Sequence, residues 1–105
     1  MSRVAIALAH LTPPQLQAGL LGASGRRWWV DFWWPEFNVI GEFDGDAKYS
    51  DPKYLNGRTP AQALRDEKDR EDDLRAAGHG MSRWGWEIAN SMARLRDQLV
   101  HAGVR

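Results

Sequence analysis

The sequence predicts one mixed α/β domain (α+β, with a mixed sheet) spanning residues 1–105. Aromatic and β-branched runs separated by short turn signals predict neighbouring antiparallel strands. A long charged segment that begins at Thr59-Pro60 predicts a helix, and a further strand-like run follows it. At 105 residues the chain has room for a single modest core. The expected order of elements is α-β-β-β-α-β-α.

The first elements follow from composition and alternation. The alanine-rich segment Ser2–His10 is typical of a helix, which Thr12-Pro13-Pro14 ends. Gln15–Leu21 is expected to be a strand. Period-two alternation places its residues Leu16, Ala18 and Leu20 on one face.

The next two strands complete an antiparallel meander. Gly22–Gly25 is a turn of hairpin length, and Arg27–Trp34 then has a strand composition. Pro35-Glu36 turns the chain again, and Phe37–Asp44 is expected to be the third strand. These short connections make the three strands sequential neighbours in the sheet.

The second half of the chain is predicted to be mainly helical. Gly45–Gly57 is polar and rich in turn residues, and a long loop of this kind is often functional. The helix from Thr59 ends at Gly78, where glycine suits a left-handed cap. His79–Trp86 follows as a fourth strand, and Glu87–Ala102 as an amphipathic helix. The long helix therefore crosses over and returns a strand to the sheet.

Composition excludes several classes of protein. Lys+Arg and Asp+Glu both number 14, so no bulk positive field attracts nucleic acid or an anionic membrane. The chain has no cysteine, which excludes a disulfide scaffold and a thiolate zinc site. The longest apolar run, Val4–Ala9, is too short to span a membrane. We therefore expect a cytoplasmic protein without a membrane partner.

Acidic residues gather where two of the predicted strands meet. Asp31 lies between apolar neighbours in the second strand, and Glu42 and Asp44 share a face at the end of the third. If these strands pair, Asp31 approaches the other two carboxylates. A hard cation such as Mg²⁺ would offset their repulsion, and Lys48 would stabilise charge developing on a phosphate. The alternative is a solvated polar end of a strand with a plain Asp-Gly turn.

Four blocks of sequence occur in a familiar order. They are V-D-F-W-W-P-E, V-I-G-E-F-D-G-x-x-K-Y, the helical R-D-E-K-D-R-E-D-D-L-R-A-A-G-H, and R-W-G-W-E. As a set, they resemble the very-short-patch-repair endonuclease-like branch of the PD-(D/E)XK nuclease superfamily. Such domains occur at the C-terminus of actinobacterial proteins, including abortive-infection antitoxin-like proteins. The resemblance covers about the whole chain and implies a restriction-endonuclease-like core.

The resemblance assigns roles to the acidic residues. Asp31 and Glu42 match the two acidic metal ligands of the superfamily signature, and Asp44 stands where many relatives have a lysine. We nevertheless count Asp44 as a metal ligand and a catalytic residue. Lys48 becomes the candidate for a relocated lysine, with Lys68 as second choice. The implied activity is Mg²⁺- or Mn²⁺-dependent hydrolysis of DNA by an endonuclease or nickase.

A second set of residues is assigned to contacts with DNA. Basic side chains at the site, on the predicted long helix and on the fourth strand would contact phosphates, although scattered surface charge is the alternative. These residues are Lys48, Arg58, Lys68, Arg70 and Arg83.

The sequence leaves a second class of function open. Relatives carry a glutamate shortly before a Ser-Arg pair like Ser2-Arg3, and this chain lacks it, which implies a truncated or weakened enzyme. The alternative is an inactive nuclease-fold module that binds protein or nucleic acid, for example a phage or toxin–antitoxin regulator. Exposed sheet edges make a homodimer plausible. Alternation places one tryptophan of each pair, Trp28-Trp29 and Trp33-Trp34, on the core face, and an exposed one would mark a partner surface.

Overall fold

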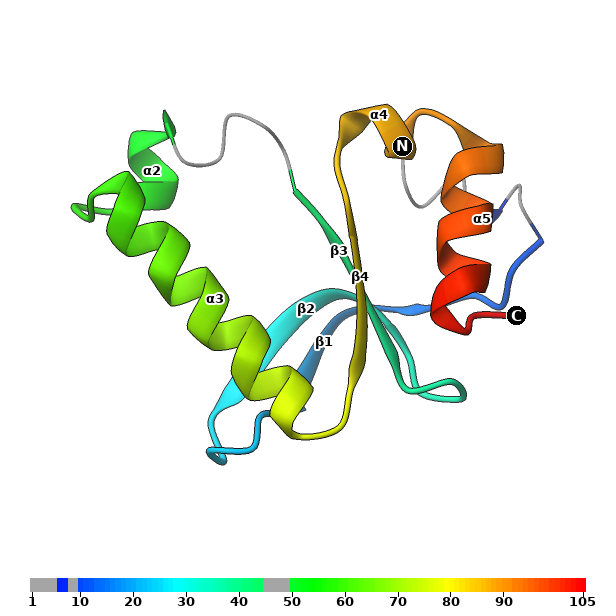
Figure 1. Cartoon of the computed structure of the whole chain (residues 1–105), viewed down its shortest axis with the longest axis horizontal. Helices are drawn as coiled ribbons and strands as arrows, with labels where there is room; N and C mark the ends of the chain where they lie inside the picture. Colours follow the sequence, from blue (N-terminus) through cyan, green and yellow to red (C-terminus); the bar gives the residue numbers. More distant parts are fainter. Residues whose placement is uncertain (1–5, 8–9, 45–49) are drawn as a thin grey trace.

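A four-stranded mixed sheet organises the chain, as seen in Figure 1. The computed structural model describes residues 6–7, 10–44 and 50–105. The first predicted helix, Ser2–His10, falls largely outside these residues; Ile6 and Ala7 are helical. The described elements are β1 (Gln15–Leu21), β2 (Arg27–Trp34), β3 (Val39–Phe43), α2 (Pro52–Leu55), α3 (Pro60–Ala76), β4 (Gly80–Trp84), α4 (Trp86–Ala89) and α5 (Met92–Ala102).

The sheet has the strand order β1-β2-β3-β4. The first three strands are antiparallel, and β4 runs parallel to β3. This parallel pair requires a crossover, and α3 lies in it, as the sequence predicted. The bounds predicted for the first two strands are confirmed.

The start of α3 is fixed by its capping residues. The Thr59 side chain accepts a hydrogen bond from the Gln62 main-chain N–H, and the Gln62 side chain accepts one from Thr59 N–H. Pro60 occupies the first turn, where its missing N–H costs nothing. At the other end Gly78 has φ +98°, the left-handed conformation that glycine tolerates.

Helices cover both faces of the sheet (Figure 1). Val39 packs in one core cluster with Leu95 and Leu99 of α5, whereas Ile40 packs in another with Leu74 of α3. Neighbouring residues of a strand point to opposite faces, so α3 and α5 lie on opposite sides. Trp34 is fully buried in the α5 cluster.

Three predicted elements are corrected. The third strand begins at Val39 rather than Phe37, because Phe37 N–H bonds to the Trp34 carbonyl at 3.2 Å in a tight turn. The predicted loop 45–57 contains α2, which Asp51 caps by accepting a hydrogen bond from Lys53 N–H. The predicted single helix Glu87–Ala102 is divided into α4 and α5, because Ser91 breaks it and caps the second part.

The fourth strand is also shorter than predicted, since β4 ends at Trp84 and α4 begins at Trp86. Within the described residues no helix has the length and apolar character needed to cross a membrane.

Candidate functional site

Regular strand pairing is interrupted at Asp31. The paired positions of β2 and β3 stop at Phe32 and Gly41. Beyond them the Asp31 main-chain N–H donates to Oε2 of Glu42 at 3.0 Å, and Phe43 N–H donates to Oδ2 of Asp31 at 3.0 Å. Two carboxylates therefore replace carbonyl oxygens as the acceptors that join the strands. Asp31 and Glu42 are therefore neighbours, each carboxylate accepting a main-chain N–H of the other strand.

The interruption extends across the sheet to β1. The pairing of β1 with β2 omits Gln17 and Asp31, and Gln17 has φ +49°, a left-handed backbone that is uncommon for glutamine. At this point in β2 the side chains no longer alternate regularly between the two faces of the sheet. Val30 and Trp33 both join the α3-side cluster, although regular alternation would place residues three apart on opposite faces.

Because of the same shift, the prediction that Leu16, Ala18 and Leu20 share one face of β1 is wrong for Leu16. Ala18 and Leu20 pack against the cluster around Leu74, as alternation predicted. Leu16 instead lines a small hollow with Ile6 and Leu11, which belong to the α5-side core. The left-handed residue between Leu16 and Ala18 accounts for the difference. Backbone irregularity of this kind is often found at functional sites.

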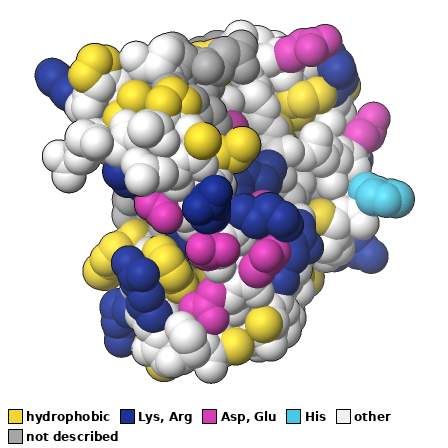
Figure 2. All heavy atoms as spheres, turned by 60° about the vertical axis from the view of Figure 1, so that its left-hand side comes forward, with side chains coloured by type: hydrophobic (Ala, Val, Ile, Leu, Met, Phe, Trp, Pro, Cys, Tyr) yellow, Lys and Arg dark blue, Asp and Glu magenta, His cyan; other side chains and the backbone are white. Residues whose placement is uncertain are grey.

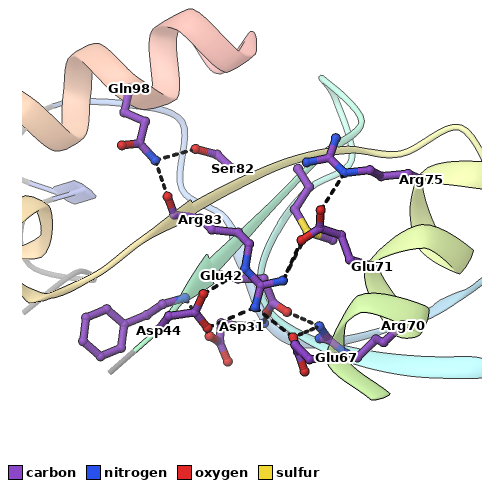
Figure 3. A network of polar contacts seen from close by, with 12 residues as sticks. Asp31, Glu42, Asp44, Glu67, Arg70, Glu71, Arg75, Ser82, Arg83 and Gln98 are labelled. Atoms are coloured by element: carbon purple, nitrogen blue, oxygen red, sulfur yellow. Dashed lines mark hydrogen bonds and ion pairs between the residues drawn. The ribbon is translucent and has the colours of Figure 1, made fainter. Parts of the chain in front are cut away.

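Arginines supply the positive charge that the carboxylates require (Figure 3). Arg70 of α3 forms an ion pair with Glu42, and both side chains are largely buried, at 14% and 6% exposure. Arg83 of β4 binds Asp44 with two hydrogen bonds, of 2.8 and 3.0 Å. The parallel pairing of β3 with β4 sets Arg83 opposite Glu42 and so beside Asp44.

Two glutamates of α3 join these pairs into one network. Oε1 of Glu67 lies 3.0 Å from Arg70 and 2.8 Å from Arg83, so it bridges the two guanidinium groups. Glu71 contacts Arg83 at 2.8 Å and Arg75 at 3.1 Å. Figure 3 shows these side chains converging from β2, β3, β4 and α3.

Burial and pairing shift the pKa values in this network. Burial raises the pKa of the Glu42 carboxyl above its ordinary value, although the hydrogen bond from Arg70 acts in the opposite direction. Burial also raises the pKa of Glu71, but hydrogen bonds from Arg75 and Arg83 outweigh it and leave that pKa low. The hydrogen bond to Asp44 raises the pKa of Arg83 further.

The carboxylates open onto a shared pocket of about 270 Å³. Asp31, Glu42, Asp44 and Glu67 line this pocket together with Phe43 and Arg70. Their oxygens are the donors that Mg²⁺ and Mn²⁺ prefer, so the residue types fit such an ion. Across the described ranges, however, no three His, Cys, Asp or Glu side chains are close enough together to hold one.

The residues expected to contact DNA lie in different settings. Arg58 binds Asp66 at 2.9 Å and two main-chain carbonyls, and Lys68 pairs with Asp72 at 3.3 Å. Arg70 and Arg83 belong to the acidic network. Lys48, the candidate relocated lysine, lies outside the described residues. On the face of the molecule drawn in Figure 2, basic and acidic side chains are intermingled, and neither sign of charge dominates.

Sequence reasoning missed that arginines neutralise the acidic cluster. The sequence analysis expects Arg70 and Arg83 to contact DNA phosphates. A signal was present, because Arg70 stands three residues after Glu67 on a helix, where the two side chains meet. The contact of Arg83 depends on the register of the parallel pair, which no local pattern specifies.

Comparison with known proteins found no matching family model, no similar curated protein and no similar solved structure.

Proposed function

We propose that this domain is a metal-dependent DNA endonuclease or nickase of the PD-(D/E)XK type. One observation carries the proposal: Asp31 and Glu42, from neighbouring strands, meet where strand pairing stops, and both line one acidic pocket. Their positions match the two acidic ligands that the sequence resemblance implies. The mixed α+β sheet is compatible with such a core.

The proposed roles follow from the side chains around the pocket. A bound Mg²⁺ or Mn²⁺ would lower the pKa of a water molecule and offset charge on the scissile phosphate. Asp31 and Glu42 would hold that ion, and their main-chain hydrogen bonds fix both carboxylates in place. Arg70 would contact a phosphate oxygen while Glu67 keeps its guanidinium oriented. Lys48 remains the proposed lysine of the site.

A plasmid-nicking assay with Mg²⁺ or Mn²⁺ tests the proposal. Asp31→Asn and Glu42→Gln keep the side-chain shape but remove the ligand charge, so both variants should lose metal-dependent cleavage. Asp97→Asn is the matched control, because Asp97 is exposed on α5, away from the pocket. Calorimetric titration with Mn²⁺ should show binding to the wild type and to Asp97→Asn. Absence of both nicking and metal binding in the wild type would refute the proposal.

A second candidate function is an inactive nuclease-fold module that binds protein or nucleic acid. The observation that favours it is the pairing of Glu42 with Arg70 and of Asp44 with Arg83, which neutralises the cluster without an ion. In this case the same variants should leave DNA intact, and the wild type should bind no Mn²⁺. Binding of DNA or of a partner protein would then be insensitive to chelator.

A further inference from the structure

Arg70 lies between two hollows in the surface of the protein. It lines the acidic pocket of about 270 Å³ and also a larger hollow of about 590 Å³, and Glu67 likewise lines both. The Arg70 guanidinium binds Glu67 at 3.0 Å and the Trp29 main-chain carbonyl at 2.5 Å. These two contacts do not involve Glu42, so they remain possible when a change of rotamer turns the guanidinium from one hollow toward the other.

On the side of the acidic pocket, Arg70 occupies an oxygen that a metal ion would need. The Glu42 side chain is 6% exposed, and both of its carboxylate oxygens have partners. Oε1 pairs with the Arg70 guanidinium, whereas Oε2 accepts the Asp31 main-chain N–H at 3.0 Å. A divalent ion at Oε1 would face the charge of Arg70 at close range in a largely buried site, where like charges repel strongly. Arg70 must therefore leave Oε1 before Glu42 can hold an ion.

The larger hollow offers the Arg70 guanidinium other carboxylates. Asp66 and Asp73 line this hollow, and they stand four residues before and three residues after Arg70 on α3. Helical side chains at these spacings are neighbours. Asp66 already binds Arg58, and Asp73 binds Ser24, but a carboxylate accepts several hydrogen bonds. A guanidinium displaced into this hollow would therefore meet acidic side chains that stabilise its charge.

We propose that Arg70 is a two-position lock on the acidic pocket. It closes the metal site while it pairs with Glu42, and it opens the site when it turns into the larger hollow. The lock rests on the metal site of the proposed function, although not on cleavage of DNA. A divalent ion and the guanidinium compete for Oε1 of Glu42. Because two competitors weaken each other's binding reciprocally, removal of the Arg70 guanidinium raises the affinity for the ion.

Calorimetric titration with Mn²⁺ tests the lock. Arg70→Gln should bind Mn²⁺ about tenfold more tightly than the wild type, since coupling between competing ligands is typically about 5- to 150-fold. Arg75→Gln is the matched control, because it removes the same charge from the same helix. Arg75 is 48% exposed and lines neither hollow, so this control should bind Mn²⁺ like the wild type. Circular dichroism and the thermal midpoint should show that both variants are folded.

Nuclear magnetic resonance provides a second readout that requires no substitution. In the wild type, the Nε–H signal of Arg70 should shift during titration with Mg²⁺, because the guanidinium leaves Glu42. The signal of Arg94, which pairs with Glu87 on the last two helices, should not change. This measurement decides the question if Arg70→Gln does not fold.

The outcomes separate the lock from the proposed activity. Equal Mn²⁺ affinities of wild type and folded Arg70→Gln, or an Arg70 signal that is unchanged at saturating Mg²⁺, would overturn the lock even if the wild type nicks DNA. A wild type that neither nicks DNA nor binds Mn²⁺, beside an Arg70→Gln variant that binds it, would refute the activity and support the lock. Absence of metal binding in both proteins would overturn both proposals.

Discussion

We expect Arg70→Met to lower the free energy of unfolding by about 3 kcal/mol, because it leaves a buried carboxylate without its partner. Glu42 is 6% exposed and pairs with Arg70, which also binds Glu67 at 3.0 Å and the Trp29 carbonyl at 2.5 Å. Breaking a buried ion pair costs roughly 3–5 kcal/mol. The lower figure applies here because Glu42 lines the acidic pocket and is therefore not enclosed by protein on every side.

The control substitution is Arg75→Met on the same helix. Arg75 is 48% exposed and pairs with Glu71 at 3.1 Å. Surface pairs of this kind contribute about 0–1 kcal/mol, so the control should be nearly neutral. Both substitutions remove one positive charge from α3. The difference between their effects on the free energy of unfolding therefore measures the contribution of the buried ion pair.

Urea unfolding followed by tryptophan fluorescence measures the effect, since Trp34 is fully buried in the native state. The expected loss corresponds to a decrease in Tm on the order of 15 °C for a domain of this size. Adding Glu42→Gln to Arg70→Met should recover part of the loss, because no buried charge then remains. Equal effects of Arg70→Met and Arg75→Met would refute this account of the network.

Three further substitutions test other parts of the structure. Gly41→Ala should cost about 2 kcal/mol in urea unfolding, because its Cβ would lie 2.8 Å from Trp84 and 2.9 Å from Trp34; a neutral effect would contradict the packing. Hydrogen bonds from Trp28 and Ser24 lower the pKa of Asp73, so its contribution is present above its ordinary pKa of 3.8 and lost as pH falls through the folded value. Asp73→Asn should therefore flatten the acid side of the stability–pH curve, measured by thermal unfolding, whereas an unchanged slope would contradict this. Burial raises the pKa of Glu42, so its contribution is present at low pH and lost as pH rises from 4.5 through the folded value. Glu42→Gln should remove this loss, and its stability relative to wild type should increase over that range.

Short-range sequence patterns predicted those strand and helix boundaries that are set by neighbouring residues. β1 and β2 have the predicted bounds because the first run of strand-forming residues ends at the Gly22–Gly25 turn and the second, which is aromatic, ends at Pro35. The start of α3 follows from Thr59 and Pro60. The apolar stripe through α4 and α5 concealed the break between them, although Ser91 is itself a helix-capping residue.

Only the acidic residues of the site could be predicted from the sequence. Asp31 and Glu42 meet because the strands are adjacent and the turn 35–38, which sets Trp34 opposite Val39, fixes their register. The positions of Arg70 and Arg83 depend on how α3 packs on the sheet and on the register of a parallel pair that follows a long crossover. Such non-local geometry leaves no pattern in a single sequence. The shift of alternation at Asp31 was also hidden, because it depends on the left-handed backbone of Gln17.

The choice between an enzyme and a binding module depends on how firmly the arginines hold the carboxylates. A cation bound to Asp31 and Glu42 must displace Arg70 from Glu42, yet Glu67 and the Trp29 carbonyl would still bind the displaced guanidinium. Arg70 would therefore remain paired during the exchange. Asp44 differs, because Arg83 binds both its oxygens and is itself held by Glu67 and Glu71. The geometry consequently makes Glu42, rather than Asp44, the carboxylate that an ion can recruit at the lower cost. Arg83 provides the positive charge beside Asp44.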